Sequence, residues 1–151
     1  MNYLKQASQQ GSSQADYQLG MYYATRNYPD VAWSYIQRSA AAHNPIALNR
    51  AAISQIFPDW NEHPITGRSL DSGFQYLQQA IDSAYFRSYY VAGAAYWTYK
   101  ERDTPDRSRA TYYLTVSQCV ADRRDPSSPE YKDGADFYYF KKTGKHLVCV
   151  Q

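Results

Sequence analysis

The residues of this chain that could take part in chemistry are three histidines, two cysteines and the carboxylates near them. His43, His63 and His146 lie far apart, and none has a second His or Cys at the spacing of a metal site. Glu62 and His63 are neighbours and could exchange a proton, but two solvated loop residues explain the pair better. The sequence therefore predicts neither a metal site nor an acid–base pair.

Nucleophilic and phosphate-binding chemistry has no better support. Cys119 would need a base brought from elsewhere in the fold, and a thiol at the end of a core helix is more often structural. The chain has no glycine-rich phosphate loop and no Gly-x-Ser-x-Gly motif. We expect no catalytic residues, no metal and no cofactor, and interpret the chain as a protein that is not an enzyme.

Length and charge narrow the class further. A chain of 151 residues is long enough for one domain with a sizeable core, so we expect a single domain over 1–151. The net charge is +2, and basic residues alternate with acids, which argues against a nucleic-acid or membrane-binding face. No stretch has the length of a membrane-spanning helix, and residues 1–20 lack the apolar core of a signal peptide.

A short motif of a small residue, an aromatic, an aliphatic and a small residue recurs along the chain at helical spacing. It reads Ala32-x-x-Tyr35-Ile36-x-x-Ser39, then Gly73-x-x-Tyr76-Leu77-x-x-Ala80, then Ala110-x-x-Tyr113-Leu114-x-x-Ser117, with a truncated copy at Tyr3-Leu4-x-x-Ala7. The interval between copies is about 30 to 40 residues, which is typical of helical repeats. The four positions fall on one helical face, so each copy predicts an amphipathic helix.

A second motif precedes each complete copy of the first. Ala15-x-x-x-Leu19-Gly20-x-x-Tyr23 matches Ser88-x-x-x-Ala92-Gly93-x-x-Tyr96, and more weakly Ala47-x-x-x-Ala51-Ala52-x-x-Gln55. Glycine costs about 1 kcal/mol in a helix relative to alanine, and close approach of a neighbouring helix is the compensation that we expect.

Together the two motifs predict three helical hairpins, over about 13–44, 45–84 and 86–121. Asp30 is a candidate cap for the second helix of the first hairpin, after the turn at Pro29. Asp125-Pro126-Ser127-Ser128-Pro129 is a break before a last helix at about 130–142. The expected helices cover about 14–25, 30–42, 45–56, 69–83, 86–100, 106–121 and 130–142.

The alternation of these two motifs resembles the Sel-1-like repeats, which are relatives of the tetratricopeptide repeat, over about residues 3–121. The Gly-x-Gly-Val stretch usual in that family is absent. The resemblance implies an all-α, right-handed superhelix (an α-solenoid) of about three repeats, with an N-terminal half-repeat and a C-terminal helix. It also implies a bacterial adaptor, regulator or partner-neutralising protein.

In such stacks the first helix of each repeat lines the concave side, which places a candidate partner-binding face. Tyr17, Asn49, Tyr90 and Trp97 fall on the face turned away from the second helix. Either neighbouring repeats bury these residues, or they line a groove for a partner protein. Trp60 lies in an insert, Phe57 to Gly67, where it either covers the end of the hairpin or contacts the partner.

The compartment is read from the cysteines and from the start of the chain. Cys119 and Cys149 are either one disulfide, which would indicate the bacterial periplasm, or two unrelated thiols compatible with the cytoplasm. The truncated motif at residues 3–7 belongs either to an N-terminal capping helix over residues 2–10 or to the second half of a repeat. In the second case an upstream segment, such as a signal peptide or lipoprotein leader, was removed.

The function expected from these features is binding to one partner protein, through the concave face and the 57–69 insert. The resemblance implies, as a sharper version, an immunity protein that neutralises a secreted bacterial effector toxin. An envelope assembly or signalling adaptor is an alternative. The other alternative is a hydrolase like the cysteine-rich, β-lactamase-like relatives, whose cysteine pair in every repeat this chain lacks.

Overall fold

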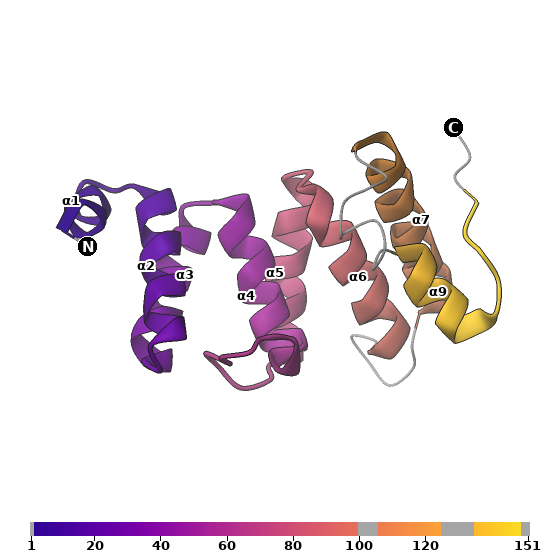
Figure 1. The fold of residues 1–151 in the computed structure, drawn as a ribbon, viewed down its shortest axis with the longest axis horizontal. Coiled ribbons are helices and arrows are strands. Elements are labelled where there is room, and N and C mark those ends of the chain that lie inside the picture. The colour runs from indigo at the N-terminus through magenta and orange to yellow at the C-terminus, as the bar shows by residue number, and fades with distance from the viewer. Residues whose placement is uncertain (1, 100–105, 125–134, 149–151) are drawn as a thin grey trace. The chain divides into compact units, whose positions relative to one another are not determined.

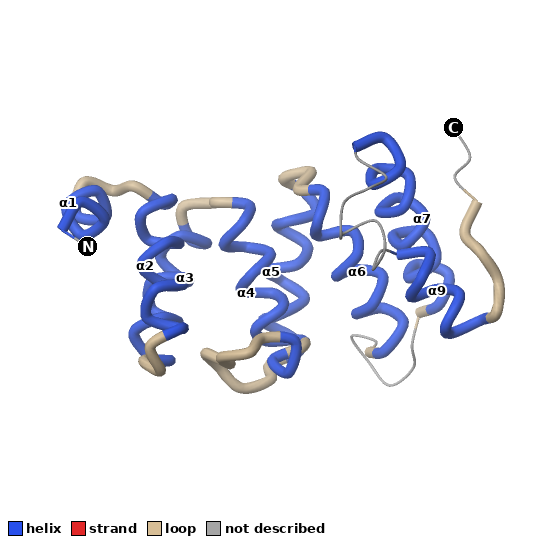
Figure 2. Tube along the Cα trace, in the orientation of Figure 1, coloured by secondary structure: helices blue, strands red, loops and turns tan. Residues whose placement is uncertain are grey.

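The computed structural model describes residues 2–99, 106–124 and 135–148, with the backbone alone at 121–124 and 137. These residues form eight α-helices and one short 3-10 helix, and none of them lies in a strand, which confirms the all-α prediction (Figure 2). The elements are α1 (Asn2–Gln9), α2 (Ser13–Thr25), α3 (Pro29–Ala41), α4 (Pro45–Ile56), η1 (Pro58–Trp60), α5 (Leu70–Asp82), α6 (Phe86–Thr98), α7 (Arg107–Arg124) and α9 (Ala135–Thr143).

The chain forms two compact units, Met1–Tyr85 and Phe86–Gln151. In the first unit α2 pairs with α3 and α4 with α5, while α1 packs on α2 and α3 contacts α4 (Figure 1). In the second unit α6 pairs with α7, and α9 packs against α7. Consecutive helices therefore pair as the two motifs predict. The right-handed superhelix, the number of repeats and the single domain stay predictions.

Three helices of the first unit, α2, α3 and α4, begin either at a capping side chain or at a proline, which has no N–H to pair. The side chains of Ser12 and Asn44 accept hydrogen bonds from first-turn N–H groups of α2 and α4 at 3.1–3.2 Å. The predicted cap at Asp30 is wrong, because α3 begins one residue earlier, at Pro29, with Tyr28 as its cap. Proline suits that first position because it has no N–H to leave unpaired.

The glycines of the motif lie where two helices of a hairpin come closest. A methyl group added at Gly20 would lie 2.7 Å from Cδ1 of Ile36, and one added at Gly93 would lie 2.5 Å from Cδ2 of Leu114. Both distances are shorter than carbon atoms tolerate. The close approach that compensates for glycine in these helices is therefore present in both units.

The tyrosines that end one motif stack on the tyrosines of the other. Tyr23 lies on Tyr35 with centroids 5.8 Å apart and planes at 2°, and Tyr96 lies on Tyr113 at 5.8 Å and 14°. Gln55 takes the tyrosine position in the middle hairpin, and its Oε1 accepts a hydrogen bond from the Ser72 hydroxyl instead. Because the same ring pair recurs, the sequence match between these two hairpins has a structural basis.

Observed and expected helix bounds agree within one residue for α2 to α5. Helix α7 extends to Arg124, beyond the expected end near 121. Helix α9 is described from Ala135, so the expected start near 130 lies outside the described residues. Across the described part of the chain, no helix has both the length and the apolar character needed to cross a membrane.

Candidate binding site

The segment that joins α4 to α5 folds as a loop closed at its base. The N–H of Ser69 donates to the carbonyl of Gln55 at 2.9 Å, and Nε of Arg68 donates to the carbonyl of Ile56 at 3.3 Å. The guanidinium of Arg68 also lies 3.9 Å from the carboxylate of Asp59. The C-terminal end of the insert is thus hydrogen-bonded to the end of α4, where the insert begins.

Ile65 anchors the middle of the insert in the core of the first unit. Only 7% of its surface is exposed, and it shares a hydrophobic cluster with side chains from three helices, Ala24, Ala32, Ile36 and Ala51. Burial of an isoleucine side chain contributes about 1.5–3 kcal/mol. Ile65, rather than Trp60, takes the role of covering the hairpin.

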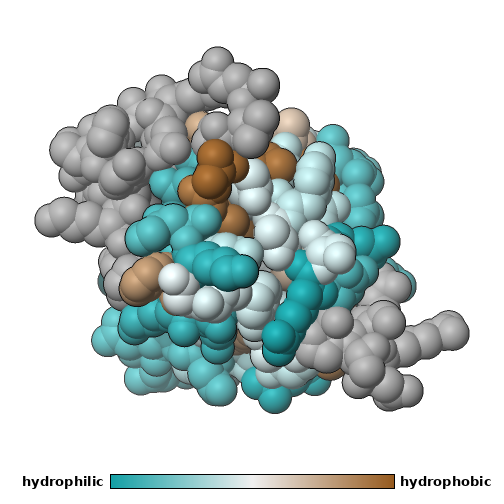
Figure 3. All heavy atoms as spheres, turned by 90° about the vertical axis from the view of Figure 1, so that its right-hand side faces the viewer, coloured by the Kyte–Doolittle hydropathy of each residue, from teal (hydrophilic) through white to brown (hydrophobic). Residues whose placement is uncertain are grey.

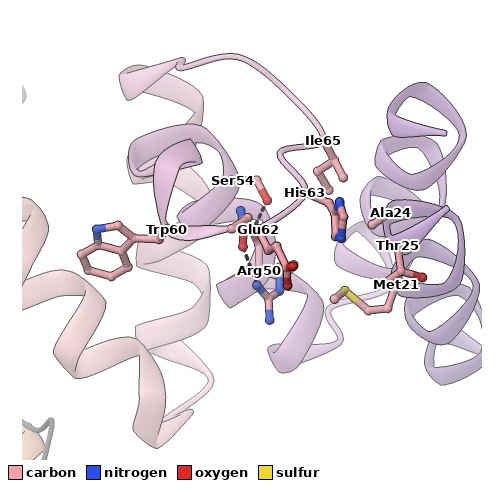
Figure 4. A pocket seen from close by; sticks show the side chains of 10 residues that line it. Met21, Ala24, Thr25, Arg50, Ser54, Trp60, Glu62, His63 and Ile65 are labelled. Carbon is pink, nitrogen blue, oxygen red and sulfur yellow. Dashed lines mark hydrogen bonds between the residues drawn. The ribbon is translucent and has the colours of Figure 1, made fainter. Parts of the chain in front are cut away.

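Trp60 is the exposed aromatic residue of the insert. Its ring stacks on Phe57, with centroids 4.1 Å apart and planes at 4°, and 44% of its surface stays exposed. In Figure 4 it lies at the opposite end of the view from Met21 and Thr25 of α2. The indole is therefore held against Phe57, and part of its surface is accessible to solvent.

A pocket of about 220 Å³ lies where the insert meets α2 and α4 (Figure 4). Met21, Ala24 and Thr25 of α2 face His63 and Ile65 of the insert in this view. Its lining consists of Met21, Ala24, Thr25, Arg50, Ser54, Trp60, Asn61, Glu62, His63 and Ile65. The pocket thus has apolar walls on the side of α2 and polar groups from α4 and the insert.

Arg50 is the basic residue of this pocket, and it is half-buried. Its Nη1 donates to Oδ1 of Asn61 at 2.7 Å. Among the described residues, no carboxylate lies within 4.0 Å of its guanidinium, and Glu62 lines the same pocket from an exposed position. A guanidinium has five N–H donors, so most of its hydrogen-bonding capacity is unused.

The other polar groups of the pocket differ in whether their hydrogen-bond donors are already paired. Nδ2 of Asn61 is buried and has no hydrogen-bond partner in the described part of the chain. The hydroxyl of Ser54 donates to the carbonyl of Arg50 at 2.8 Å, and that of Thr25 donates to the carbonyl of Tyr22 at 2.9 Å. Both hydroxyl protons are already committed. Arg50 and Asn61 keep N–H groups that have no acceptor among the described residues, and half-buried His63 lies in the same lining.

The candidate residues of the first unit's helices, Tyr17 and Asn49, are half-buried and buried. Tyr17 is half-buried and packs on both hydrophobic clusters of this unit. Asn49 is 6% exposed, and its Oδ1 has no hydrogen-bond partner among the described residues. Of these two, neither offers a large accessible surface.

Helix α9 covers the candidate aromatic residues of the second unit. Tyr90 meets Tyr138 edge to face at 6.0 Å, and Trp97 meets Tyr139 in the same way. Trp97 is 8% exposed, and the guanidinium of Arg107 lies 4.9 Å from the centroid of its ring. The C-terminal helix occupies the surface at which we expected a partner.

The predicted cysteine pair is not tested, because Cys149 lies outside the described residues. Over the ranges that the structure describes, no three residues among His, Cys, Asp and Glu lie close enough together to hold a metal ion.

In the face of the second unit that Figure 3 shows, the coloured surface is mainly hydrophilic or intermediate, with few hydrophobic side chains.

Sequence reasoning missed Arg50, Asn61 and Ile65. One signal was available for Arg50, since the motif aligns it with the apolar Val91, although it also aligns with the polar Gln18. The structure buries Val91 and exposes Gln18, so the repeat does not fix the burial of this position. No comparable signal existed for Asn61 or Ile65, because the insert has no counterpart in the other hairpins.

Comparison with known proteins adds no further constraint. No protein-family model matches this chain, and no curated protein matches it. The resemblance to Sel-1-like repeats therefore rests on the motifs alone.

Proposed function

We propose that this chain is a binding module that engages one partner protein through the 57–69 insert. The observation that carries this proposal is the placement of Trp60, which stacks on Phe57 and keeps 44% of its surface exposed. Tryptophan is enriched among the residues that dominate binding energy at protein interfaces. An exposed indole at the edge of a pocket is suited to that role.

The way the insert is fastened supports the same proposal. The Ser69–Gln55 hydrogen bond and the buried Ile65 fix the loop before any partner arrives. A loop already held in one conformation loses little conformational entropy on binding, so more of the contact energy appears as affinity. This argues for recognition by a rigid surface.

The proposed surface differs from the concave face that the repeat pattern favours. Tyr17 and Tyr90 are half-buried and Asn49 and Trp97 are buried, whereas 44% of the Trp60 surface is exposed. The proposal therefore places the main contact on the insert rather than on these four helix residues.

The test compares Trp60→Ala with Tyr3→Ala in the full chain. Tyr3 is 87% exposed in the same unit, so its replacement removes a similar surface aromatic away from the insert. Proteins captured by the wild-type chain from a lysate of its source are identified, and the purified partner is titrated by calorimetry. We expect a one-to-one complex that Trp60→Ala weakens about tenfold or more and Tyr3→Ala leaves unchanged. Equal affinity of both variants contradicts the proposal.

A narrower form of this role is an immunity protein for a secreted effector toxin, acting in the periplasm. Its support is the resemblance to small Sel-1-like proteins, and an envelope adaptor fits the same resemblance. Co-expression with a toxin encoded next to this chain decides between them. Protection that Trp60→Ala abolishes supports immunity, and growth arrest despite a folded wild-type chain contradicts it.

A further inference from the structure

We propose that the pocket beside the insert binds the carboxylate of a glutamate side chain that the partner protein supplies. This inference rests on the proposed function and deepens it, because it names the chemistry of one partner residue. It starts from two donors, Arg50 and Asn61, that face one small pocket with their capacity unused.

The first step concerns Arg50. A half-buried guanidinium has lost part of its hydration, and a nearby carboxylate usually compensates for that loss. Within the part of the chain that the structure describes, no carboxylate lies within 4.0 Å of this guanidinium. The planar fork of arginine matches a carboxylate through two parallel hydrogen bonds, so an incoming carboxylate is the group that completes the site.

The second step concerns Asn61. Its Oδ1 is fixed by the hydrogen bond from Arg50, which forces the amide nitrogen to be the free end of the side chain. That nitrogen is buried and lacks an acceptor among the described residues. A buried donor left unpaired costs about 1–3 kcal/mol, and a ligand oxygen that accepts a hydrogen bond from this nitrogen removes this cost.

The third step concerns size and the apolar wall. A pocket of about 220 Å³ is smaller than the usual range of about 300–1,000 Å³ for small-molecule sites, so it fits one side chain better than a cofactor. Met21, Ala24 and Ile65 line it beside the polar groups. A glutamate presents two methylene groups to such a wall and its carboxylate to the donors.

Glu62 limits how much negative charge a ligand group can bring into the pocket. It lines the pocket from an exposed position and bears the same charge as the proposed ligand group. Its repulsion favours a singly charged carboxylate over a doubly charged phosphate. It also gives a variant with the opposite effect, since Glu62→Gln should tighten binding.

The experiment follows the side-chain N–H signals of Arg50 and Asn61 by NMR in the full chain. N-acetyl-glutamate methylamide is titrated, with the uncharged N-acetyl-glutamine methylamide as the matched probe. We expect the glutamate probe to shift both signals in a saturable way and the glutamine probe to leave them in place. N-acetyl-alanine, which carries a terminal carboxylate, distinguishes a chain end from a side chain; binding as tight as that of the glutamate probe overturns our choice of glutamate.

Three variants test the assignment of the donors. Arg50→Gln should weaken the glutamate probe about tenfold or more, because a charge-assisted hydrogen bond is lost. Arg26→Gln removes the same charge from a guanidinium that lies 3.5 Å from the centroid of the Tyr22 ring, outside the pocket, and should leave binding unchanged. Glu62→Gln should tighten binding, and this result remains informative if Arg50→Gln fails to fold.

The outcomes separate this inference from the proposed function. Unshifted Arg50 and Asn61 signals at saturating probe, or equal loss in Arg26→Gln and Arg50→Gln, overturn the carboxylate site. If a partner is still captured through Trp60 in that case, the proposed function stands without it. If the probe binds but capture does not depend on Trp60, the pocket stands and the insert's role in recognition falls.

Discussion

The rings of Trp97 and Tyr139 meet edge to face, with centroids 6.0 Å apart and planes at 84°. One belongs to α6 and the other to α9, so the last described helix is fastened to a hairpin by aromatic contacts. Tyr90 and Tyr138 form a second contact of the same kind. These pairs make α9 part of the second unit's packing.

Trp97→Ala should therefore destabilise the chain. Removing a tryptophan that is 8% exposed leaves a cavity and frees α9, and we expect a loss of about 3–5 kcal/mol in the free energy of unfolding. Urea denaturation followed by circular dichroism measures it. Tyr112→Ala, which removes an exposed aromatic from α7, serves as control and should cost about 1 kcal/mol or less. Equal losses in the two variants would show that α9 is not held by Trp97.

Gly93→Ala should also destabilise, although alanine is the better helix former. The added methyl group would lie 2.5 Å from both Cγ and Cδ2 of Leu114, so either the Leu114 side chain or the two helices must shift. Overpacking of this kind costs about 1–3 kcal/mol, which exceeds the gain of about 1 kcal/mol in helix propensity over most of that range. Thermal unfolding of Gly93→Ala, Gly67→Ala and wild type measures the effect. A methyl group at Gly67 meets no atom within 4 Å, so that variant should unfold at or above the wild-type temperature.

Asp136 should make the attachment of the chain's last described residues depend on acid pH. Burial alone would raise the pKa of Asp136, but hydrogen bonds from the Leu147 N–H and the His146 ring outweigh it and lower the pKa. A carboxylate with a lowered folded pKa stabilises the fold above its unfolded pKa of about 3.9, and this contribution is lost as pH falls through the lower folded value. The amide signal of Leu147, followed from pH 7 downward, should change in that acid window.

Asp136→Asn should release the same segment at neutral pH. The side chain is partly exposed, so the cost should be about 1 kcal/mol or less. Faster hydrogen exchange at Leu147 in Asp136→Asn, with no change in Asp71→Asn, is the expected result. Unchanged exchange in Asp136→Asn would mean that other contacts hold the segment.

The disulfide between Cys119 and Cys149 stays a prediction and has a simple test. Intact mass before and after reduction should differ by two hydrogens if the bond is present. Closing a loop of about 30 residues stabilises by about 3–4 kcal/mol in the chain-entropy model, so reduction should lower the unfolding temperature. Identical masses would leave two separate thiols.

The helices of this protein were predictable because each carries its own local signals. Periodic small and aromatic residues predict α2 to α5 to within one residue, and Gly20 and Gly93 identify where helices approach. The prediction of Asp30 as the cap was wrong because Pro29, which suits the first position of a helix, stands beside it. The local sequence does not decide whether the helix begins at the proline or after the aspartate.

The candidate site was less predictable, since it depends on contacts between distant segments. Whether Trp97 lines a groove or is buried is decided by α9, about forty residues later, and nothing in the repeat motif indicates that packing. The choice between Ile65 and Trp60 as the covering residue depends on how the insert closes at Gln55 and Ser69. Periodicity carries no information about a loop that occurs once.

The hydrogen bond that joins Ser69 to Gln55 has a consequence for how this protein can change over generations. This hydrogen bond holds the two ends of the insert together, and Ile65 fixes one position between them in the core. Substitutions at the exposed positions Glu62 and Pro64 can accumulate without disturbing the hairpin that carries them. If the insert binds a partner as we propose, such substitutions change the contact surface while the fold stays constant.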